Sequence, residues 1–519
     1  MTAETSLPRC SLQEVGIDAS GVKKFLKEIE AEGYHLHSFM ITRHGKVAYE
    51  CCWAPYRLEE EHLMHSFTKG LVASAVGILE GEGRISLDDP AITYFPEYRT
   101  ADTEEKQAGI TLEHLLTMTN GHAAVPDRHG CDDEIRAFFQ EPVIHEPGTV
   151  FEYDSLGSHV LASIVKRVTG YNLFQFLQLR VFDAMGISGV SCDSCATGKD
   201  QGGGGGRLKT EDMAKLTILY LNGGVWNGQQ LIPKDWIDRM TVTRFAGCKD
   251  KFNPDWEDWR CGYGYQVWMC QIPNTFRFDG LHGQFGVVLK DLDASIITTC
   301  GECYTEAVLR LMWKYLVPAV KRPEEIQNSA QKETEQWLED QKEKLHILWP
   351  LEQELSGEQR EAAEAELIGK YIIFGENRES VLPASRRNNC FTALWTEQHR
   401  TGIQNLRIRK EDEGYILDYE DNCNHGSLPL GMDESPARGL LRSLWGDYKV
   451  WTGARWRKDG CLEMQIRMVN GEYYQVFTIC PKDGQAVVGI YSGPWDRRKG
   501  KPENAEYRCK LHPRSSVIR

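Results

Sequence analysis

Ser66 and Lys69 stand three positions apart in HSFTKGLVASAVGILEGEG, and they carry the strongest chemical signal in this chain. The apolar residues after them recur at helical spacing and stop at two glycines: Leu71, Val72, Ala75, Val76, Ile78, Leu79, then Gly81 and Gly83. Ser66 is therefore predicted at a helix N-terminus, with Lys69 one turn further on the same face. A serine hydroxyl becomes a nucleophile when a neighbour takes its proton, and a partly buried lysine can do so. The alternative is a helix cap followed by a surface lysine.

A second motif, Tyr153-Asp154-Ser155, directly precedes another apolar helical segment. A tyrosine beside a lysine can carry the proton of a serine to a leaving group. The hydroxyl of Ser155 could bond the substrate or Lys69. Taken alone, the motif also fits a core tyrosine at the start of a helix.

A third segment, FRFDGLHGQFGVVLKDLDASIITT, alternates like a strand and then turns into another strand. Glycines in an edge strand let a substrate backbone or carbonyl approach closely. The segment is therefore predicted to form one side of a binding site.

In this order, the three segments resemble those of the β-lactamase and penicillin-binding-protein superfamily of serine hydrolases. Other matching landmarks are RHGKVAYE, EGEGRISLDDP, ITLEHLLTMTNGH and LNGGVWNGQQLIPKDWI, and the similarity runs from about residue 14 to residue 299. The chain looks nearest to the esterase, D-aminopeptidase and aminohexanoate-oligomer hydrolase branch. The resemblance implies an α+β fold, in which helices flank an antiparallel sheet and a helical subdomain is added.

The resemblance also implies a role for each motif residue. Ser66 would be the acylated nucleophile, Lys69 its general base, and Tyr153 the acid/base that serves the leaving group. Ser155 matches the second residue of the tyrosine motif. The backbone N–H of Ser66 would form half of the oxyanion hole.

Two registers compete for the other half of that hole. In the first, the family's K-T-G triplet falls on residues 278–280, ending at Gly280, and Leu281 supplies the N–H. In the second, His282-Gly283 is an H-x-G variant, and Gln284 or Phe285 supplies it. We favour the first register.

In both registers the lysine of K-T-G is missing, which weakens the case for β-lactamase activity. Four residues could replace its charge or its hydrogen bonds: Arg260, Arg277, His282 and Gln284.

Two segments are expected to wall the pocket. The glycine run 202–206 would allow close approach or motion. The second segment offers three aromatic side chains for an acyl pocket: Trp256, Trp259 and Tyr263. Tyr265 and Trp268 alternate in a strand and are assigned to the core. Acidic residues in the same loop would favour a cationic or neutral substrate group: Asp255, Glu257 and Asp258.

No metal or cofactor is expected. Cys192 and Cys195 form a lone C-x-x-C, and no second pair follows at zinc-site spacing. His62 and His65 precede the serine, where local bonding explains them better than a metal does. The sixteen cysteines of this chain are interpreted as free thiols, because no export signal is visible at the N-terminus.

The chain has 519 residues and a formal charge of -15, which disfavours binding to nucleic acid. No apolar run approaches the length of a membrane helix, so a cytoplasmic protein is expected. We expect three regions: 1–320 for the hydrolase-like domain, 321–369 for a charged helical connector, and 370–519 for short alternating strands. The last region resembles the lipocalin-like, all-β barrel domain often fused to these hydrolases, which could cover the active-site mouth or mediate a homodimer.

The sequence thus predicts a serine hydrolase that cleaves an ester or amide bond of a small molecule or short peptide through a Ser66 acyl-enzyme. Two alternatives stay open. One is acyl transfer from the same intermediate, and the other is a non-catalytic ligand-binding or sensor protein on this fold.

Overall fold

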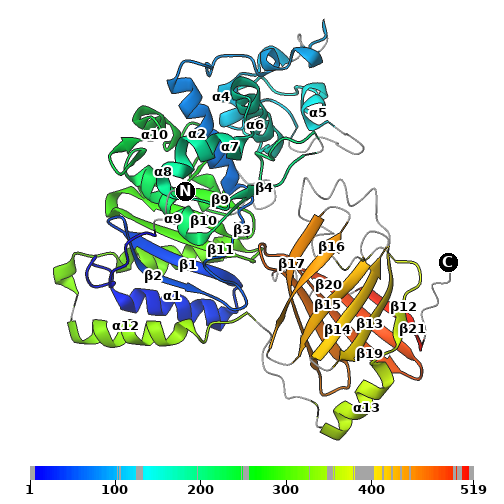
Figure 1. Cartoon of the computed structure of the whole chain (residues 1–519). Helices are drawn as coiled ribbons and strands as arrows, with labels where there is room; N and C mark the ends of the chain where they lie inside the picture. Colours follow the sequence, from blue (N-terminus) through cyan, green and yellow to red (C-terminus); the bar gives the residue numbers. More distant parts are fainter. Residues whose placement is uncertain are drawn as a thin grey trace. The chain divides into compact units, whose positions relative to one another are not determined.

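The computed structural model divides into two compact units, which are described separately (Figure 1). Unit 1 comprises Met1–Cys300 and Tyr304–Leu345, and unit 2 comprises Gly301–Cys303 and His346–Arg519. The structure describes residues 6–513 apart from 102, 104–106, 124–132, 196, 247, 249–255, 327, 348–354, 356, 378, 380, 382–401, 412–413, 422–424, 433–434, 444–445, 495–497 and 499–504.

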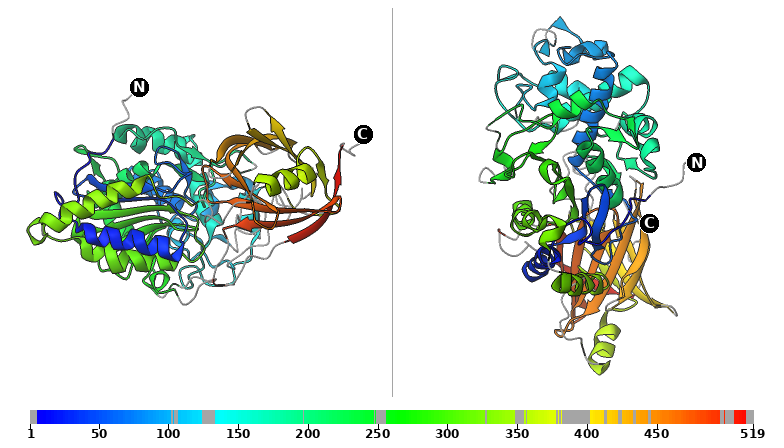
Figure 2. Two further views of the ribbon diagram at one scale, coloured as in Figure 1. Left: turned by 90° about the horizontal axis from the view of Figure 1, so that it is seen from below. Right: turned by 90° about the vertical axis from the view of Figure 1, so that its left-hand side faces the viewer.

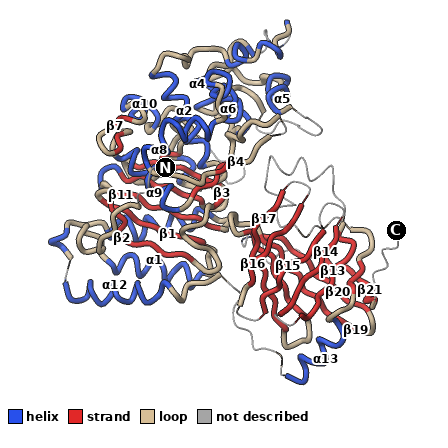
Figure 3. Tube along the Cα trace, in the orientation of Figure 1, coloured by secondary structure: helices blue, strands red, loops and turns tan. Residues whose placement is uncertain are grey.

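Unit 1 is built on an antiparallel sheet of six strands (Figure 3). Their order across the sheet is β2 (Lys46–Cys52), β1 (Leu36–Arg43), β11 (Ala294–Cys300), β10 (Gln284–Leu289), β9 (Thr275–Gly280) and β8 (Trp268–Met269). The strands β10 and β11 are buried along their whole length. Strands buried on both faces require helices on both sides of the sheet.

One face of the sheet is covered by α1 (Ala19–Glu32), whose Phe25 packs on Phe39 of β1 with ring centroids 5.0 Å apart. Beside α1 lies α12 (Asn328–Lys342), and Figure 2 shows the two helices next to each other. Lys23 of α1 extends over the ring of Trp337 at 4.5 Å. The first half of the predicted connector is therefore packed on unit 1. The helix α11 (Thr305–Leu311) also packs against α1.

The other face is covered by α2 (Phe67–Gly81) and α9 (Thr210–Leu221). Every residue of α2 from Phe67 to Leu79 is buried, as expected for a predominantly apolar helix in the core. Two glycines let aromatic rings press against its backbone, because a Cβ at Gly70 would lie 2.2 Å from Phe278 and one at Gly77 would lie 2.3 Å from Trp236. This close packing fixes the N-terminus of α2, where Ser66 stands.

A helical subdomain completes unit 1. Its helices are α4 (Leu112–Leu116), α5 (Glu134–Gln140), α6 (Ser155–Thr169), α7 (Leu173–Leu177), α8 (Asp183–Met185) and α10 (Lys234–Met240). Of these, α10 packs beside α2. Small sheets join these helices: β3 (His62–Leu63), β5 (Gly206–Leu208) and β4 (Ser191–Cys192) form one, and β6 (Val225–Trp226) and β7 (Gln229–Gln230) form another. The predicted α+β architecture, with an antiparallel sheet, flanking helices and a helical subdomain, is confirmed.

Unit 2 is a closed β-barrel. Its strands follow one another in the order β15 (His425–Met432), β14 (Gly414–Asp421), β13 (Ile403–Glu411), β12 (Tyr371–Ile373), β21 (Ala505–His512), β20 (Gln485–Gly493), β19 (Tyr474–Lys482), β18 (Leu462–Met468), β17 (Gly446–Trp456) and β16 (Ala437–Ser443). A parallel pairing of β15 with β17 closes the ring. The helix α13 (Gly357–Leu367) packs on β19, and Leu367 joins the barrel core. The predicted barrel domain is confirmed, and the second half of the predicted connector belongs to it.

The expectation that all cysteines are free thiols is wrong. Cys461 and Cys480 form a disulfide between two neighbouring strands of the barrel. The pairing of β18 with β19 sets Leu462 opposite Ile479, so the two cysteines face each other at the next position. The sequence did not reveal this pair, because two cysteines at a sequence separation of 19 match no recognisable spacing motif. Within the part of the chain that the structure describes, no helix combines the length and hydropathy of a membrane span.

Candidate active site

Ser66 stands at the junction between a short strand and the buried helix α2. Met64 donates its N–H to the carbonyl of Gly206 at 2.9 Å, which fixes the chain just before the serine. The chain then turns through His65, whose φ of 48° is in the left-handed region. The half-buried Ser66 caps α2 by position, and its side chain faces Lys69 rather than the helix backbone.

Lys69 brings its amine to the serine. Its Nζ donates to Ser66 Oγ at 2.7 Å and to the carbonyl oxygen of Gly203 at 2.5 Å. The same Nζ lies 4.9 Å from the centre of the Tyr153 ring. The side chain of Lys69 is fully buried. A hydroxyl and an amine from one helical turn thus meet the ring of a tyrosine from a second segment.

The tyrosine motif is held by the cap of α6. Asp154 accepts hydrogen bonds from the N–H groups of Leu156 at 2.7 Å and Gly157 at 3.1 Å. Asn120 adds a third bond by donating its side-chain N–H to the same carboxylate at 2.9 Å. Asp154, the middle residue of the motif, therefore holds the backbone of Tyr153 and Ser155 in place. Tyr153 is half-buried, and Ser155 is half-buried at the first position of α6.

Burial also keeps His122 neutral close to this cap. It lowers the pKa of the His122 imidazole from 6.5 to about 4, and the charge of Asp154 opposes the shift. The ring nitrogen Nε2 of His122 lies 3.2 Å from Gln107 Oε1. Because this carboxamide oxygen can only accept, Nε2 carries the proton.

Aromatic side chains surround Tyr153. Its ring stacks on Trp268 at 5.7 Å and meets Tyr263 edge-on at 6.2 Å. Burial raises the pKa of Tyr263 well above its usual value, so this phenol stays protonated. Trp268, assigned to the core from the sequence, is buried and also contacts the candidate site. Tyr265 points elsewhere, because its hydroxyl donates to Glu113 at 2.7 Å.

Trp256 and Trp259 are only 8% and 5% exposed, so both are packed into the interior of unit 1. Their rings lie 4.7 Å apart, and Trp259 lies 6.3 Å from Trp268. The two tryptophans therefore form an outer layer behind the rings that face Tyr153.

The structure describes two of the three acidic residues of this loop, and they differ in exposure. Asp255 lies outside the described residues, and Glu257 is exposed. Asp258 is fully buried, and its carboxylate accepts from Trp313 Nε1 at 2.7 Å and Gln271 Nε2 at 2.9 Å. A carboxylate used in this way cannot attract a substrate cation.

The third motif forms a hairpin of β9 and β10 with a turn at Leu281–Gly283. Gly280 pairs with Gln284 across the hairpin. A Cβ at Gly280 would lie 2.1 Å from the carbonyl oxygen of Met64, so the end of β9 lies against the segment that leads into Ser66. Leu281, at the tip, is 44% exposed. His282 is buried with a φ of 66°, and its ring centroid lies 6.0 Å from that of His65.

Of the four residues considered as replacements for the missing lysine, two are held by other groups. Arg277 is fully buried and donates to Asp279 Oδ2 at 2.7 Å and to the carbonyl of Met269 at 2.8 Å. Gln284 donates from Nε2 to the carbonyls of Cys300 at 2.6 Å and Leu281 at 3.0 Å.

Arg260 is exposed at the end of a short helical turn. At the lysine position itself in the favoured register, Phe278 stacks on Phe67 with centroids 4.7 Å apart. Of the four candidates, only His282 is placed close to the serine, because its ring packs against His65, the residue before Ser66.

The glycine run contributes its backbone to the site. A Cβ at Gly202 would lie 2.5 Å from Ala162 Cβ and 2.7 Å from the carbonyl of Ser158, both on α6. At the other end of the run, Gly206 donates its N–H to Thr68 Oγ1 at 3.0 Å. The run is thus clamped between α6 and α2, which places the carbonyl of Gly203 against Lys69.

The two histidines before the serine contact different partners. His62 lies 2.8 Å from a ring nitrogen of His37, whereas His65 packs against His282.

Comparison with known proteins gives a consistent picture. The family model described as Beta-lactamase matches residues 30–302. Esterase EstB of Burkholderia gladioli is 28% identical over 175 residues, which cover 28% of this chain and 44% of EstB. The 6-aminohexanoate-dimer hydrolase of Paenarthrobacter ureafaciens is 26% identical over 270 residues, which cover 48% of this chain and 68% of that enzyme. The chain thus spans less than half the length of EstB.

A solved structure from Bacillus anthracis, named for the 6-aminohexanoate-dimer hydrolases, superposes with a TM-score of 0.51 at 18% identity. The superposition covers 62% of this chain and 89% of that one. At this identity the likeness concerns the fold.

Proposed function

The chain belongs to the beta-lactamase family, and on that premise we propose that it is a serine hydrolase whose Ser66 attacks the carbonyl of a small ester or amide. The observation that carries the proposal is the 2.7 Å contact between Lys69 Nζ and Ser66 Oγ, made by a lysine with no exposed surface. Burial disfavours the charged form of an amine, and a neutral lysine can accept the proton of the hydroxyl.

The first half of the reaction forms an acyl-enzyme. The proton of Ser66 passes to Lys69 Nζ as Oγ bonds to the substrate carbonyl carbon. Tyr153, whose ring lies against the same amine, relays a proton to the leaving alkoxide or amine. The bond from the carbonyl carbon to the leaving group then breaks. In the second half, a water molecule gives a proton to the same groups, attacks the acyl carbon and releases Ser66.

The oxyanion would form between two backbone N–H groups. One belongs to Ser66, at the N-terminus of α2, where the helix dipole favours negative charge. The other belongs to Leu281, since β9 ends against Met64 and the chain turns there. This arrangement supports the register in which residues 278–280 replace K-T-G, and Gly280 allows the close approach. In the other register the N–H would come from Gln284 or Phe285, which already pair with Gly280 and Asp279 of β9.

The substrate should be uncharged and partly apolar at its acyl side. The wall beside Tyr153 is formed by Tyr263 and Trp268. Phe278 stands where the family's carboxylate-binding lysine would be, and Arg277 is paired with Asp279. A penicillin carboxylate would therefore lack its usual partner. The names of the matched relatives, an esterase and an amide hydrolase, agree with an ester or amide substrate.

Intact-protein mass spectrometry tests this proposal. The full chain is incubated with activated esters of short acyl groups, amino-acid amides and a penicillin, beside the Ser66→Ala variant. We expect an ester-derived mass increase in the natural chain, no increase in Ser66→Ala, and little or none from the penicillin. The decay of the adduct measures deacylation by water. A folded protein that gains no mass from any ester would refute the proposal.

A further inference from the structure

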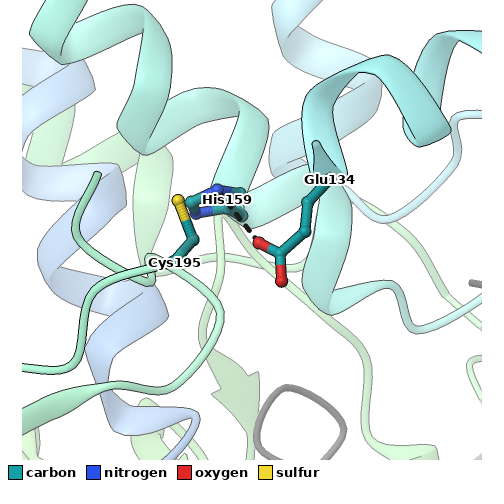
Figure 4. Close-up of side chains that lie close together, drawn as sticks. All are labelled: Glu134, His159 and Cys195. Carbon is teal, nitrogen blue, oxygen red and sulfur yellow. Dashed lines mark ion pairs between the residues drawn. The ribbon is translucent and has the colours of Figure 1, made fainter. Parts of the chain in front are cut away.

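A second group of reactive side chains meets in unit 1, outside the set formed by Ser66, Lys69 and Tyr153. Glu134 of α5, His159 of α6 and Cys195 of the loop after β4 converge, with the imidazole lying between the carboxylate and the sulfur (Figure 4). One ligand atom from each lies within 4.8 Å of the other two. Among the described residues, this is the one such group of histidine, cysteine and acidic side chains.

We propose that Glu134, His159 and Cys195 bind a zinc ion, with a water molecule as the fourth ligand. A thiolate, an imidazole and a carboxylate are the three protein ligand types that zinc accepts in tetrahedral sites. Binding exchanges the thiol proton for the metal, so one proton leaves Cys195 for each ion bound. The two anionic ligands balance the charge of the ion, and His159 binds as the neutral ring.

The spacing of two of the ligand atoms, those of His159 and Glu134, fits a tetrahedral ion. Two ligands that each lie about 2.0–2.1 Å from zinc are about 3.4 Å apart at the tetrahedral angle. His159 Nε2 and Glu134 Oε2 are 3.3 Å apart. An ion could therefore bind between these two atoms without separating α5 from α6.

The backbone that carries each ligand is already held in place. Asp133 caps α5 by accepting from the N–H of Ile135 at 3.1 Å, and Asp154 caps α6. Cys195 donates its N–H to the carbonyl of Lys199 at 2.8 Å within a tight turn. Such preorganisation lowers the cost of assembling the site when the ion arrives.

Burial favours a metal site over a second nucleophile. A cysteine, histidine and glutamate in contact could also form a thiol-hydrolase triad. However, His159 is fully buried and Cys195 is 7% exposed, so a substrate carbonyl has little access to the sulfur. A small cation needs much less room.

The ion would anchor the segment that reaches Lys69. Cys195 lies eight positions before Gly203, whose carbonyl accepts from Lys69. Two backbone hydrogen bonds connect the same stretch of chain: Gln201 donates its N–H to the carbonyl of Asp193 at 2.8 Å, and Asp193 donates its N–H to the carbonyl of Gly205 at 3.0 Å. The bound zinc would therefore join α5, α6 and the loop that leads into the glycine run.

Calorimetric titration of the reduced, chelator-treated full chain with Zn²⁺ tests the site. We expect one ion per chain, and binding at least about 100-fold weaker in Cys195→Ser and His159→Gln. Cys192→Ser is the matched control, because it changes the other, half-buried cysteine of the C-x-x-C and should bind normally. With Co²⁺ as the probe, a thiolate-to-cobalt charge-transfer band should form in the natural chain and in Cys192→Ser and be missing from Cys195→Ser.

Thermal unfolding provides an independent readout, since an ion that binds only the folded state raises the melting temperature. Zn²⁺ should raise it in the natural chain and in Cys192→Ser, but not in His159→Gln. The proposal is overturned if the folded, reduced chain binds no stoichiometric zinc, or if Cys195→Ser and His159→Gln bind it as tightly as the natural chain. These measurements need no turnover, so they stand apart from the reaction proposed for Ser66.

Discussion

At the scale of single residues, Lys69 combines full burial with two short hydrogen bonds. Its amine contacts Ser66 and Gly203 and lies against the Tyr153 ring. An amine in this position can exchange protons with two partners without leaving its place. The chemistry proposed for Ser66 therefore depends on this one side chain more than on any other.

Replacing the amine by a thioether tests that dependence. Lys69→Met keeps the length of the side chain and removes the base, so ester acylation of Ser66 should slow by about 100- to 10,000-fold. The rate of mass increase with an activated ester measures the effect. A variant acylated within tenfold of the natural rate would show that another group takes the proton.

His122 predicts a pH-dependent stability of unit 1. Above pH 6.5 its ring is neutral in both the folded and the unfolded state. Because burial lowers its pKa to about 4, the unfolded chain gains the proton first as the pH falls from 6.5. The free energy of unfolding should therefore fall by about 1–3 kcal/mol between pH 6.5 and pH 4.

Denaturant unfolding of His122→Gln across the same pH range isolates this contribution. Glutamine keeps a donor for Gln107 but does not titrate, so the difference in stability between the two proteins should shrink as the pH falls. A constant difference would mean that His122 has the same pKa in both states.

Residue chemistry was predictable where it is local in the sequence. The S-x-x-K spacing predicts that a hydroxyl and an amine meet on one helical turn, and the structure places them 2.7 Å apart. Their catalytic roles stay predictions. Glu134, His159 and Cys195 could not be found in this way, because they are 25 and 36 residues apart along the chain and only the tertiary fold brings them together.

At the scale of secondary structure, the glycine run is a packing element rather than a flexible loop. Gly202 and Gly206 lie against α6 and α2 at distances that exclude a side chain. The sequence indicated close approach or motion as alternatives for this run. The contacts of the two end glycines favour close approach.

Gly202→Ala should therefore be harmful. Its Cβ would clash with Ala162 and with the backbone carbonyl of Ser158, and the segment would have to shift away from Lys69. We expect a loss of about 1–3 kcal/mol in stability together with slower acylation.

Gly204→Ala is the matched control. The nearest atom to its added Cβ is 3.4 Å away, an ordinary van der Waals contact, and the backbone there is not left-handed. Equal effects of the two substitutions on stability and acylation would contradict the packing argument.

The hairpin of β9 and β10 shows the limit of pattern reading at this scale. Alternating apolar residues predicted two strands, which the structure contains as β9 and β10. The pattern did not tell which faces the side chains would take. Arg277 and Asp279 share one face and pair with each other, so the arginine considered as a substrate ligand is bound within the protein.

At the scale of the whole molecule, a pattern in the sequence predicted each of the two units. Mixed helical and strand patterns predicted the first unit, and short alternating strands with turn residues predicted the barrel. The division of the connector was not predictable, because α12 and α13 have similar composition and differ in what they contact. Gln331 of α12 donates to the carbonyl of Ile17 at 2.9 Å, whereas Glu364 of α13 accepts from Tyr415 at 2.6 Å.

The disulfide of the barrel makes a prediction at this scale. Joining Cys461 to Cys480 closes a loop with a sequence separation of 19, which restricts the unfolded chain. Cys480→Ser should therefore lower the stability of unit 2 by about 3 kcal/mol. Denaturant unfolding without reductant measures this loss.

Adding reductant to the natural chain should reproduce the loss and should leave Cys480→Ser unchanged. Cys509→Ser is a control, because it removes a buried free thiol from the same barrel without opening a cross-link. A natural chain that unfolds identically with and without reductant would contradict the prediction.

The hydrogen bond from Lys69 to Gly203 has a genetic consequence. Its acceptor is a main-chain carbonyl, and every amino acid that replaces Gly203 would still carry one. No codon change can delete this acceptor, whereas a single change at Ser66 or Tyr153 removes the functional group. Mutational scans will therefore report the bond only indirectly, through positions such as Gly202 that shape the path of the chain. While Lys69 is kept, natural variation can alter this hydrogen bond only by shifting the backbone at Gly203.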